Sequence, residues 1–197
     1  MPAYDIAFDF RATIGYVSDP SYATYCVGES YPTTRTINGY SITFGWETGV
    51  GSIIPVDGNS ALDPRIAGIN FKQNTGTASV FRVDLPGSGA VTVGMSLGDT
   101  RNNPCTSCVV VSDTISSLIS FTAIQTGNTV ADATNTIWTV TQWPANNVSA
   151  NVSFGTTICR VSIGGTNIPG TFSGLNHLRF TGNTSSSLRN LPLLGAG

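Results

Sequence analysis

The residues that could carry acid–base or nucleophilic catalysis are few. The chain has one histidine, His177, and two glutamates, Glu29 and Glu47. Acid–base hydrolysis needs two carboxylates that face one bond, and nucleophilic catalysis needs a serine or cysteine beside a base. Residues 96–99, SLGD, have the composition of an esterase nucleophile block, but residues 100–104 lack the helix that follows a catalytic serine. We therefore expect no catalytic residue and no enzyme activity.

The single histidine has a structural interpretation. It lies in residues 175–180, LNHLRF, and in a regularly alternating strand His177 shares a face with Leu175. A histidine in such a place is more often a hydrogen-bonded structural residue than a general base. We therefore expect His177 to support the fold.

The chain also offers few metal ligands. Cys105 and Cys108 have the spacing of half a zinc site, but no second cysteine pair follows. These two are expected to stay reduced or to close after release from the cell, whereas Cys159 alternates with apolar residues and is expected in the core. Aspartates in predicted loops could bind calcium, but capping of turns is the simpler role. The aspartates in predicted loops are Asp57, Asp63, Asp99 and Asp113. We expect no bound metal and no cofactor.

Tryptophans are the candidates for sugar binding, because a pyranose ring stacks on a flat apolar side chain while polar neighbours hold its hydroxyl groups. Trp46 has the same parity as Ile42 and Phe44, which predicts burial in the core. Trp138 lies within a predicted strand, and Trp143 lies at a predicted turn, WPANN. The candidate carbohydrate-binding residues are therefore Trp143, Asn146 and Trp138.

Two alternating segments form the predicted centre of the fold. Apolar residues occupy every second position of residues 81–85 and 91–97, and a loop containing PGSG separates the two runs. Alternation with period two predicts strands, and a short glycine-containing loop between them predicts a β-hairpin with one apolar face. An isolated hairpin is marginally stable in water, so a second sheet must cover this face.

The other alternating segments supply that second sheet. Residues 11–38 and 49–64 are predicted as long loops, the first with a short strand near residues 25–27. A tight turn at residues 155–156 is predicted to pair the strands on either side of it. Short strands without helical periodicity predict an all-β fold, a two-sheet antiparallel β-sandwich. Besides the central pair, strands are predicted at residues 4–10, 41–46, 69–71, 109–111, 118–124, 135–142, 147–154, 157–163 and 175–180.

Composition argues against several classes of partner. Charged residues make up 10% of the 197 residues, the formal net charge is −2, and Lys72 is the single lysine. Nucleic acids and anionic membranes are bound by concentrated lysine and arginine, which this chain lacks. No apolar run approaches the ~18 residues of a membrane span, and residues 1–5 do not resemble a secretory signal. We expect synthesis in a cytoplasm, with neither nucleic acid nor membrane as partner.

The end of the chain differs in composition from the rest. Residues 1–181 carry the strand pattern and are expected to form the sandwich, whereas residues 182–197 are expected to form an extended tail outside it. Apolar side chains in the tail could dock on a neighbouring protein. The candidate docking residues are Leu188, Leu191, Leu193 and Leu194.

Several short motifs, taken in order and spacing over residues 4–181, carry a family resemblance. They are Phe8-Asp9-Phe10, Phe44-Gly45-Trp46, Asp63 with Arg65, residues 81–86 (FRVDLP), residues 91–93 (VTV), residues 97–99 (LGD) and residues 175–180 (LNHLRF). In this respect the chain resembles the galactose-binding-like jelly-roll module found beside pectin-acting esterases and lyases. The resemblance implies a jelly roll of two packed antiparallel sheets, usually non-catalytic and often used for carbohydrate or protein contact. The match departs in residues 11–38, in the loop with Cys105 and Cys108, and in lacking an attached catalytic domain.

Three functions from different classes follow from these observations. A structural protein of a virus particle, such as a capsid decoration or accessory protein of a bacteriophage, accounts for the low charge and the surface rich in threonine, serine and asparagine. Its expected partners are further copies of itself and a major capsid or other virion protein, with a cell-surface glycan as a further candidate, and its expected location is the virion. A carbohydrate-binding module for plant or bacterial polysaccharide is the alternative. A small carbohydrate esterase accounts for the fewest features.

Overall fold

A computed structural model gives the fold as an all-β structure. It describes residues 3–13, 17, 20–57, 68–73, 75–97, 107–112, 121–126, 129–131, 137–139, 148–154, 156–164 and 172–184. Within these residues the chain forms fifteen strands and one short 3-10 turn, η1 (Val50–Ser52). The predicted fold class is confirmed at this level. In the described residues, no helix has the length and apolar character needed to cross a membrane.

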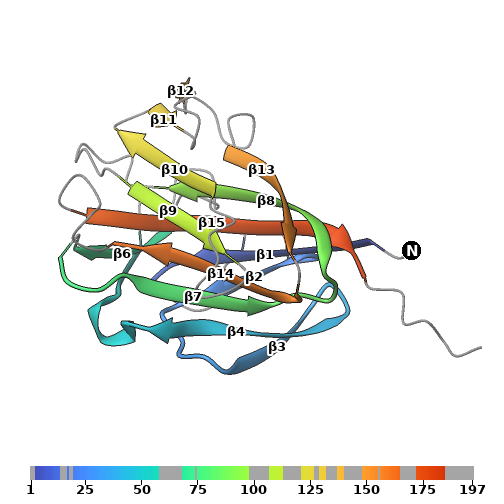
Figure 1. The fold of residues 1–197 in the computed structure, drawn as a ribbon. Helices are drawn as coiled ribbons and strands as arrows, with labels where there is room; N and C mark the ends of the chain where they lie inside the picture. Colours follow the sequence, from blue (N-terminus) through green and yellow to red (C-terminus); the bar gives the residue numbers. More distant parts are fainter. Residues whose placement is uncertain are drawn as a thin grey trace, which may run out of the picture.

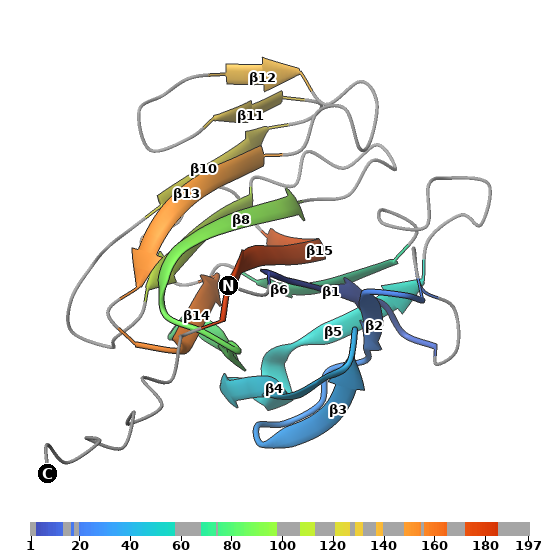
Figure 2. The same ribbon diagram turned by 90° about the vertical axis from the view of Figure 1, so that its right-hand side faces the viewer.

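The strands form two sheets, shown in Figure 1. The seven-stranded sheet contains β1 (Ala3–Phe10), β2 (Ala23–Cys26), β5 (Ile54–Asp57), β6 (Gly68–Gln73), β8 (Gly89–Leu97), β13 (Val148–Phe154) and β15 (Phe172–Asn183). The eight-stranded sheet contains β3 (Thr33–Ile37), β4 (Tyr40–Thr48), β7 (Ser79–Asp84), β9 (Ser107–Ser112), β10 (Phe121–Thr126), β11 (Thr129–Ala131), β12 (Ile137–Thr139) and β14 (Ile158–Ile163). Strands β10, β11 and β12 lie at the end of the molecule opposite to β3 and β4 (Figure 2).

Pairing between strands is antiparallel with one exception. In the seven-stranded sheet the order is β13-β8-β15-β1-β2, and β6 joins the edge of β15 beyond the end of β1. Strand β2 pairs with β1 in parallel, so the expectation of purely antiparallel sheets is wrong at this edge. The reason is topological: the connection from β1 to β2 is long enough to bring the chain back beside Ala7, so that β2 runs along the second half of β1 in the same direction.

The predicted central hairpin is wrong, although both of its strands exist. Strand β7 pairs with β4 and β14 in one sheet, and β8 pairs with β13 and β15 in the other (Figure 1). The loop that contains residues 86–88 therefore carries the chain across the sandwich. Both apolar faces are buried as expected, but they face each other across the core, because that arrangement covers both at once.

The same correction applies to residues 148–163. A tight turn at residues 155–156 was predicted to pair two neighbouring strands, yet β13 pairs with β8 and β14 pairs with β7 and β9. Alternation in a sequence shows which face of a strand is apolar, but it does not show which sheet the strand joins.

Two segments predicted as loops contain the strands β3 and β5, and β11 lies between two predicted strands, at residues to which no element was assigned. Strand β3 pairs with β4 across the two-residue turn Asn38-Gly39, where both residues have positive φ. Asn-Gly is the strongest short hairpin signal, so the sequence did contain the information for β3. Strand β5 pairs with β6, and β11 pairs with β10 and β12; both are too short to show a clear alternation.

The core lies between the two sheets and is rich in aromatic rings. Phe8, Phe44, Trp46 and Phe81 are each at most 1% exposed. The Phe81 ring lies 5.4 Å from Phe8, 6.1 Å from Phe44 and 5.3 Å from Trp46. Burial of Trp46 and of Cys159 is confirmed, as the parity of their strands predicted. This packing holds the two sheets at a fixed separation.

Candidate functional site

The predicted site residues fall mostly outside the described part of the chain. Trp143 and Asn146 lie there, as do the four leucines of the tail, Leu188, Leu191, Leu193 and Leu194. Trp138 lies in β12 opposite Val130 of β11, but its side chain is not described. The carbohydrate-binding and docking roles of these residues therefore stay predictions. Strand β15 runs to Asn183, two residues past the predicted boundary of the sandwich.

His177 forms a buried pair with Asp9. The two residues are directly opposite in β15 and β1, and the Nδ1 atom of His177 lies 2.6 Å from an Oδ1 atom of Asp9. Each residue is 2% exposed. A pair this deeply buried ties the first strand of the chain to the last, which agrees with the structural role expected for the histidine.

A β-bulge places His177 on the outer face of its sheet. The register of β15 against β8 shifts between Leu175 and His177, so one extra residue, Asn176, stands between them. Leu175 and Leu178 both face the core. The expectation that His177 shares the face of Leu175 is therefore wrong, because a bulge reverses the parity of every residue that follows it.

Five polar side chains gather on the outer face of the eight-stranded sheet, and we call them the Arg82 cluster: Tyr31, Glu47, Arg82, Asp84 and Arg160. Arg82 and Arg160 are directly opposite in β7 and β14. Glu47 accepts hydrogen bonds from both, at 3.2 Å from Arg82 and 2.7 Å from Arg160. Arg82 also donates to Asp84 at 2.9 Å. The charges of two guanidiniums and two carboxylates cancel within the cluster.

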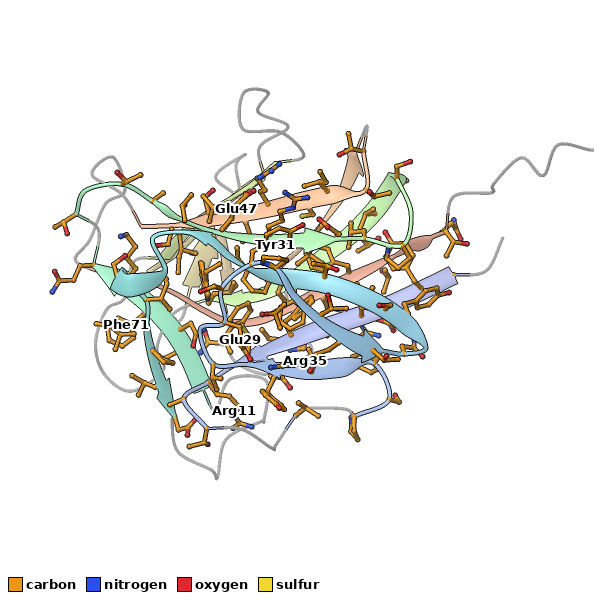
Figure 3. The ribbon with its side chains drawn as sticks, turned by 90° about the horizontal axis from the view of Figure 1, so that it is seen from below. Arg11, Glu29, Tyr31, Arg35, Glu47 and Phe71 are labelled. Atoms are coloured by element: carbon orange, nitrogen blue, oxygen red, sulfur yellow. The ribbon has the colours of Figure 1, made fainter. Side chains whose placement is uncertain are left out.

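Tyr31 completes the Arg82 cluster from the loop before β3 (Figure 3). Its hydroxyl donates to Asp84 at 2.9 Å, and the Arg82 guanidinium lies 4.3 Å above its ring. The backbone at Tyr31 can lie this close to β4 because residue 45 in β4 is a glycine. A Cβ atom there would lie 2.5 Å from the Tyr31 nitrogen, and the φ of Gly45 is +140°.

The electrostatics of the Arg82 cluster do not suit acid–base catalysis. Hydrogen bonds from Arg160 hold the pKa of the Glu47 carboxyl below its usual value, although partial burial opposes them, and Arg82 adds to the effect. Partial burial and the hydrogen bond to Asp84 raise the pKa of the Tyr31 hydroxyl. Glu47 is therefore ionised and Tyr31 is protonated near neutral pH, so neither has the pKa near the working pH that suits a general acid or base.

Another group of polar side chains lies around β1 and β2, at the edge of the sandwich where Arg35 of β3 reaches across to β2. We call it the β1–β2 face and define it by Asp5, Tyr22, Tyr25, Arg35 and Arg179. Arg179 donates two hydrogen bonds to Asp5, at 2.8 and 2.6 Å, and its guanidinium lies 4.4 Å above the Tyr22 ring. Arg35 lies 4.2 Å above the Tyr25 ring. Two tyrosine rings are thus held in fixed orientations by two guanidiniums.

Arg35 also closes the edge of the sandwich. It comes from β3 in one sheet and donates hydrogen bonds to Glu29 and to the carbonyl of Tyr25 in β2 of the other sheet (Figure 3). Glu29 in turn accepts a hydrogen bond from the Val27 nitrogen at 2.7 Å. The long segment predicted as a loop is therefore fixed to both sheets.

Sequence reasoning did not identify either group. Their members are separated by up to 174 residues in the chain, as Asp5 and Arg179 are. One signal was present: the arginines and aspartates of this charge-poor chain recur at the polar positions of alternating strands. Among the described residues, no group of three or more histidine, cysteine, aspartate and glutamate side chains could hold a metal ion.

Comparison with known proteins does not assign this chain to a family. No protein-family model matches the chain, and no curated protein matches it. Among solved structures, the crystal structure of YxiM from Bacillus subtilis is similar, with 13% identity and a TM-score of 0.48. The match covers 91% of this chain and 40% of the YxiM chain. At this level the similarity supports no statement about activity or ligand.

Proposed function

We propose that this protein is a non-catalytic structural protein of a virus particle, a decoration or accessory protein of a bacteriophage, which acts through contacts with copies of itself and with a capsid protein. The observation that supports a non-catalytic role is the state of its acid–base groups. His177 is buried against Asp9, and Glu47 is shared between Arg82 and Arg160. The virion role rests on composition, on the low charge and the polar uncharged surface residues.

We also propose that the sandwich is a jelly roll of the galactose-binding-like kind. Strands β7 and β14 pair in one sheet, β8 and β13 pair in the other, and each strand of the first pair connects to one of the second. These four strands form a two-stranded antiparallel ribbon folded across the sandwich, as expected in a jelly roll. Jelly rolls recur in viral shells and in lectins.

The test of the virion role is binding to particles that lack the protein. The purified full chain should sediment with such particles, and a variant with serine at Leu188, Leu191, Leu193 and Leu194 should sediment less. The variant should keep the circular dichroism spectrum and melting temperature of the parent. If the folded parent stays in the supernatant at every concentration, the virion role is wrong.

Carbohydrate binding is the second candidate, and the β1–β2 face favours it. Half-buried tyrosine rings beside paired polar groups are the surface that a sugar ring requires. Trp143, Asn146 and Trp138 stay candidates for an additional contact. A titration with plant or bacterial polysaccharide that quenches tryptophan fluorescence in the parent, but not in Trp143→Phe, would support their role. We do not propose an esterase activity.

A further inference from the structure

Strand β3 forms one edge of the eight-stranded sheet and lies lowest in both views of the ribbon (Figure 1, Figure 2). Among the described strands it pairs with β4 alone, across the turn Asn38-Gly39. In a hairpin with a two-residue turn, the residues that flank the turn exchange both backbone hydrogen bonds, and bonded and non-bonded pairs then alternate. Ile37 and Arg35 therefore bond to β4, whereas the N–H and C=O groups of Thr34 and Thr36 point away from it.

These outward backbone groups are open to a further strand. We call Thr34, Arg35 and Thr36 the β3 edge. Both threonines are exposed, and their outward N–H and C=O groups have no hydrogen-bond partner in the described part of the chain. The hydroxyl of Thr34 lies 3.1 Å from that of Thr43 in β4, so it does not cover them. An open edge of this kind can accept another strand through main-chain hydrogen bonds.

Two edges of the other sheet are protected, and the β3 edge is not. Strand β5 has four residues and contains Pro55, which has no N–H group to offer. The edge of β2 is covered by Arg35, which donates hydrogen bonds to the Thr24 hydroxyl and to the Tyr25 carbonyl. Proline and covering side chains are the usual protection of a sheet edge. The β3 edge has no proline, and its single charged side chain is turned toward β2.

The sequence of the β3 edge is symmetric about Arg35, because Thr34-Arg35-Thr36 reads the same in both directions. Two antiparallel copies with a two-fold axis at Arg35 place Thr34 of one copy opposite Thr36 of the other. Each of these two pairs exchanges two backbone hydrogen bonds, so every outward group of both edges gains a partner. Threonine opposite threonine is also a favourable side-chain pair. The edge is therefore complementary to itself.

Charge on the β3 edge also suits a second copy. Like charges directly opposite each other destabilise a strand pair. The outer side of this edge carries only the uncharged Thr34 and Thr36. The two arginines at the axis are compensated, because each Arg35 donates to Glu29 of its own chain and lies 4.2 Å over its own Tyr25 ring. Pairing therefore brings no uncompensated charges together.

We propose that the β3 edge pairs with the β3 edge of a second copy of this chain, antiparallel about Arg35, and joins two eight-stranded sheets into one. This inference rests on the proposed virion role and gives the contact between copies a surface. Three residues on each side cover much less than the ~1,000 Å² of a stable interface, so the free pair is weak and dissociates on dilution. In a particle, where many copies are held at fixed positions, a high effective concentration favours the pair.

The test is amide hydrogen exchange of the full chain, measured by NMR at high and low protein concentration, with sedimentation velocity at the same concentrations. The amides of Thr34 and Thr36 should exchange at least twofold more slowly at the high concentration, where a dimer should sediment. The amides of Arg35 and Ile37, which are bonded to β4, should exchange at the same rate at both concentrations.

A proline at Thr36 tests the outward N–H group directly. Thr36→Pro removes that group without removing a hydrogen bond to β4, and it should abolish both the dimer and the concentration dependence at Thr34. Thr36→Val is the matched control, because it keeps the N–H group and should dimerise as the parent does. Circular dichroism checks the fold of both variants. The amide measurement on the parent decides the question even if the proline variant unfolds.

Three results would overturn the proposal: a parent that stays monomeric at every concentration, a dimer in which the exchange of Thr34 and Thr36 is unchanged, or an undiminished dimer of the folded Thr36→Pro variant. Sedimentation with particles is a separate measurement. A parent that binds particles but does not dimerise through this edge contradicts the edge alone. One that dimerises through the edge but binds no particle contradicts the virion role alone.

Discussion

Titratable side chains in the described part of this protein form pairs and small networks. Asp9 with His177, Asp5 with Arg179 and Glu29 with Arg35 each join strands that are distant in the sequence. Glu47 extends this pattern, because it bridges two arginines that would otherwise repel each other across β7 and β14. A chain with only 10% charged residues thus concentrates its charge at strand-to-strand contacts.

The bridge at Glu47 predicts a stability change in acid. Arg160 and Arg82 hold the pKa of Glu47 in the folded protein below its usual value. The bridge therefore contributes fully to the free energy of unfolding at pH values above the pKa that Glu47 has in the unfolded chain. This contribution is lost as the pH falls through the pKa of Glu47 in the folded protein. Glu47→Gln should lower the free energy of unfolding by about 1–3 kcal/mol at pH 7. Urea denaturation at pH 7 and pH 3 measures this, and the difference between parent and variant should shrink at pH 3. An equal difference at both pH values would contradict the bridge.

We predict that breaking the buried pair of Asp9 and His177 lowers the free energy of unfolding more than Glu47→Gln does. Removing one partner of a buried pair leaves the other without compensation, which costs about 3–5 kcal/mol. Asp9→Asn and His177→Gln should each lower stability by an amount of this order. A double variant should lose less than the sum of the two single losses, because the two residues interact directly. Additive losses in urea denaturation would mean that the two side chains do not interact.

Strands in this protein are defined by local alternation, but their partners are not. Strands β7 and β8 follow one another closely and still join different sheets, and β13 and β14 do the same. Each strand buries the same residues that a hairpin would have buried. Covering two apolar faces with each other removes more surface from water than a hairpin with one face exposed.

The parity of β8 is testable with two neighbouring residues. Val93 is fully buried, whereas Thr92 is half-buried and faces away from the core. Val93→Asp should destabilise the protein by several kcal/mol or unfold it, because it places an unpaired charge in the core. Thr92→Asp should have a much smaller effect. Melting temperatures followed by circular dichroism compare the two, and equal losses would contradict the assigned face.

The molecule as a whole has one core that closes over two of its four cysteines. Cys26 lies in β2 and Cys159 in β14, in different sheets, and the exposed fraction of each is 0%. Burial raises the pKa of the Cys26 thiol well above its usual value, with a further contribution from the charge of Glu29. Both thiols are therefore protected for as long as the sandwich stays closed.

Thiol labelling reports on this closure. In a background with serine at Cys105 and Cys108, a thiol reagent at pH 8 should label neither remaining cysteine in the native protein. Both should react in 6 M guanidinium chloride. Because opening of one core exposes both together, labelling at intermediate denaturant should follow a single transition that coincides with circular dichroism. Early labelling of one cysteine alone would indicate separate units.

Local sequence patterns were enough to identify the all-β class, most of the strands and the core residues Trp46 and Cys159. These features follow from the period-two alternation of a pleated strand, which depends on neighbouring residues alone. The short strands β5 and β11 were missed because three or four residues carry too little alternation to be recognised.

Long-range contacts decided everything that concerns the candidate sites. The sheet that each strand joined, the face of His177 and the Arg82 cluster all depend on residues far apart in the chain. The β1–β2 face also depends on residues far apart in the chain. A single bulge at Asn176 moved His177 from the core side to the outer side of β15, where it meets Asp9. Such pairings are selected by the packing of complete sheets, and that packing is not encoded in the pattern of any one segment.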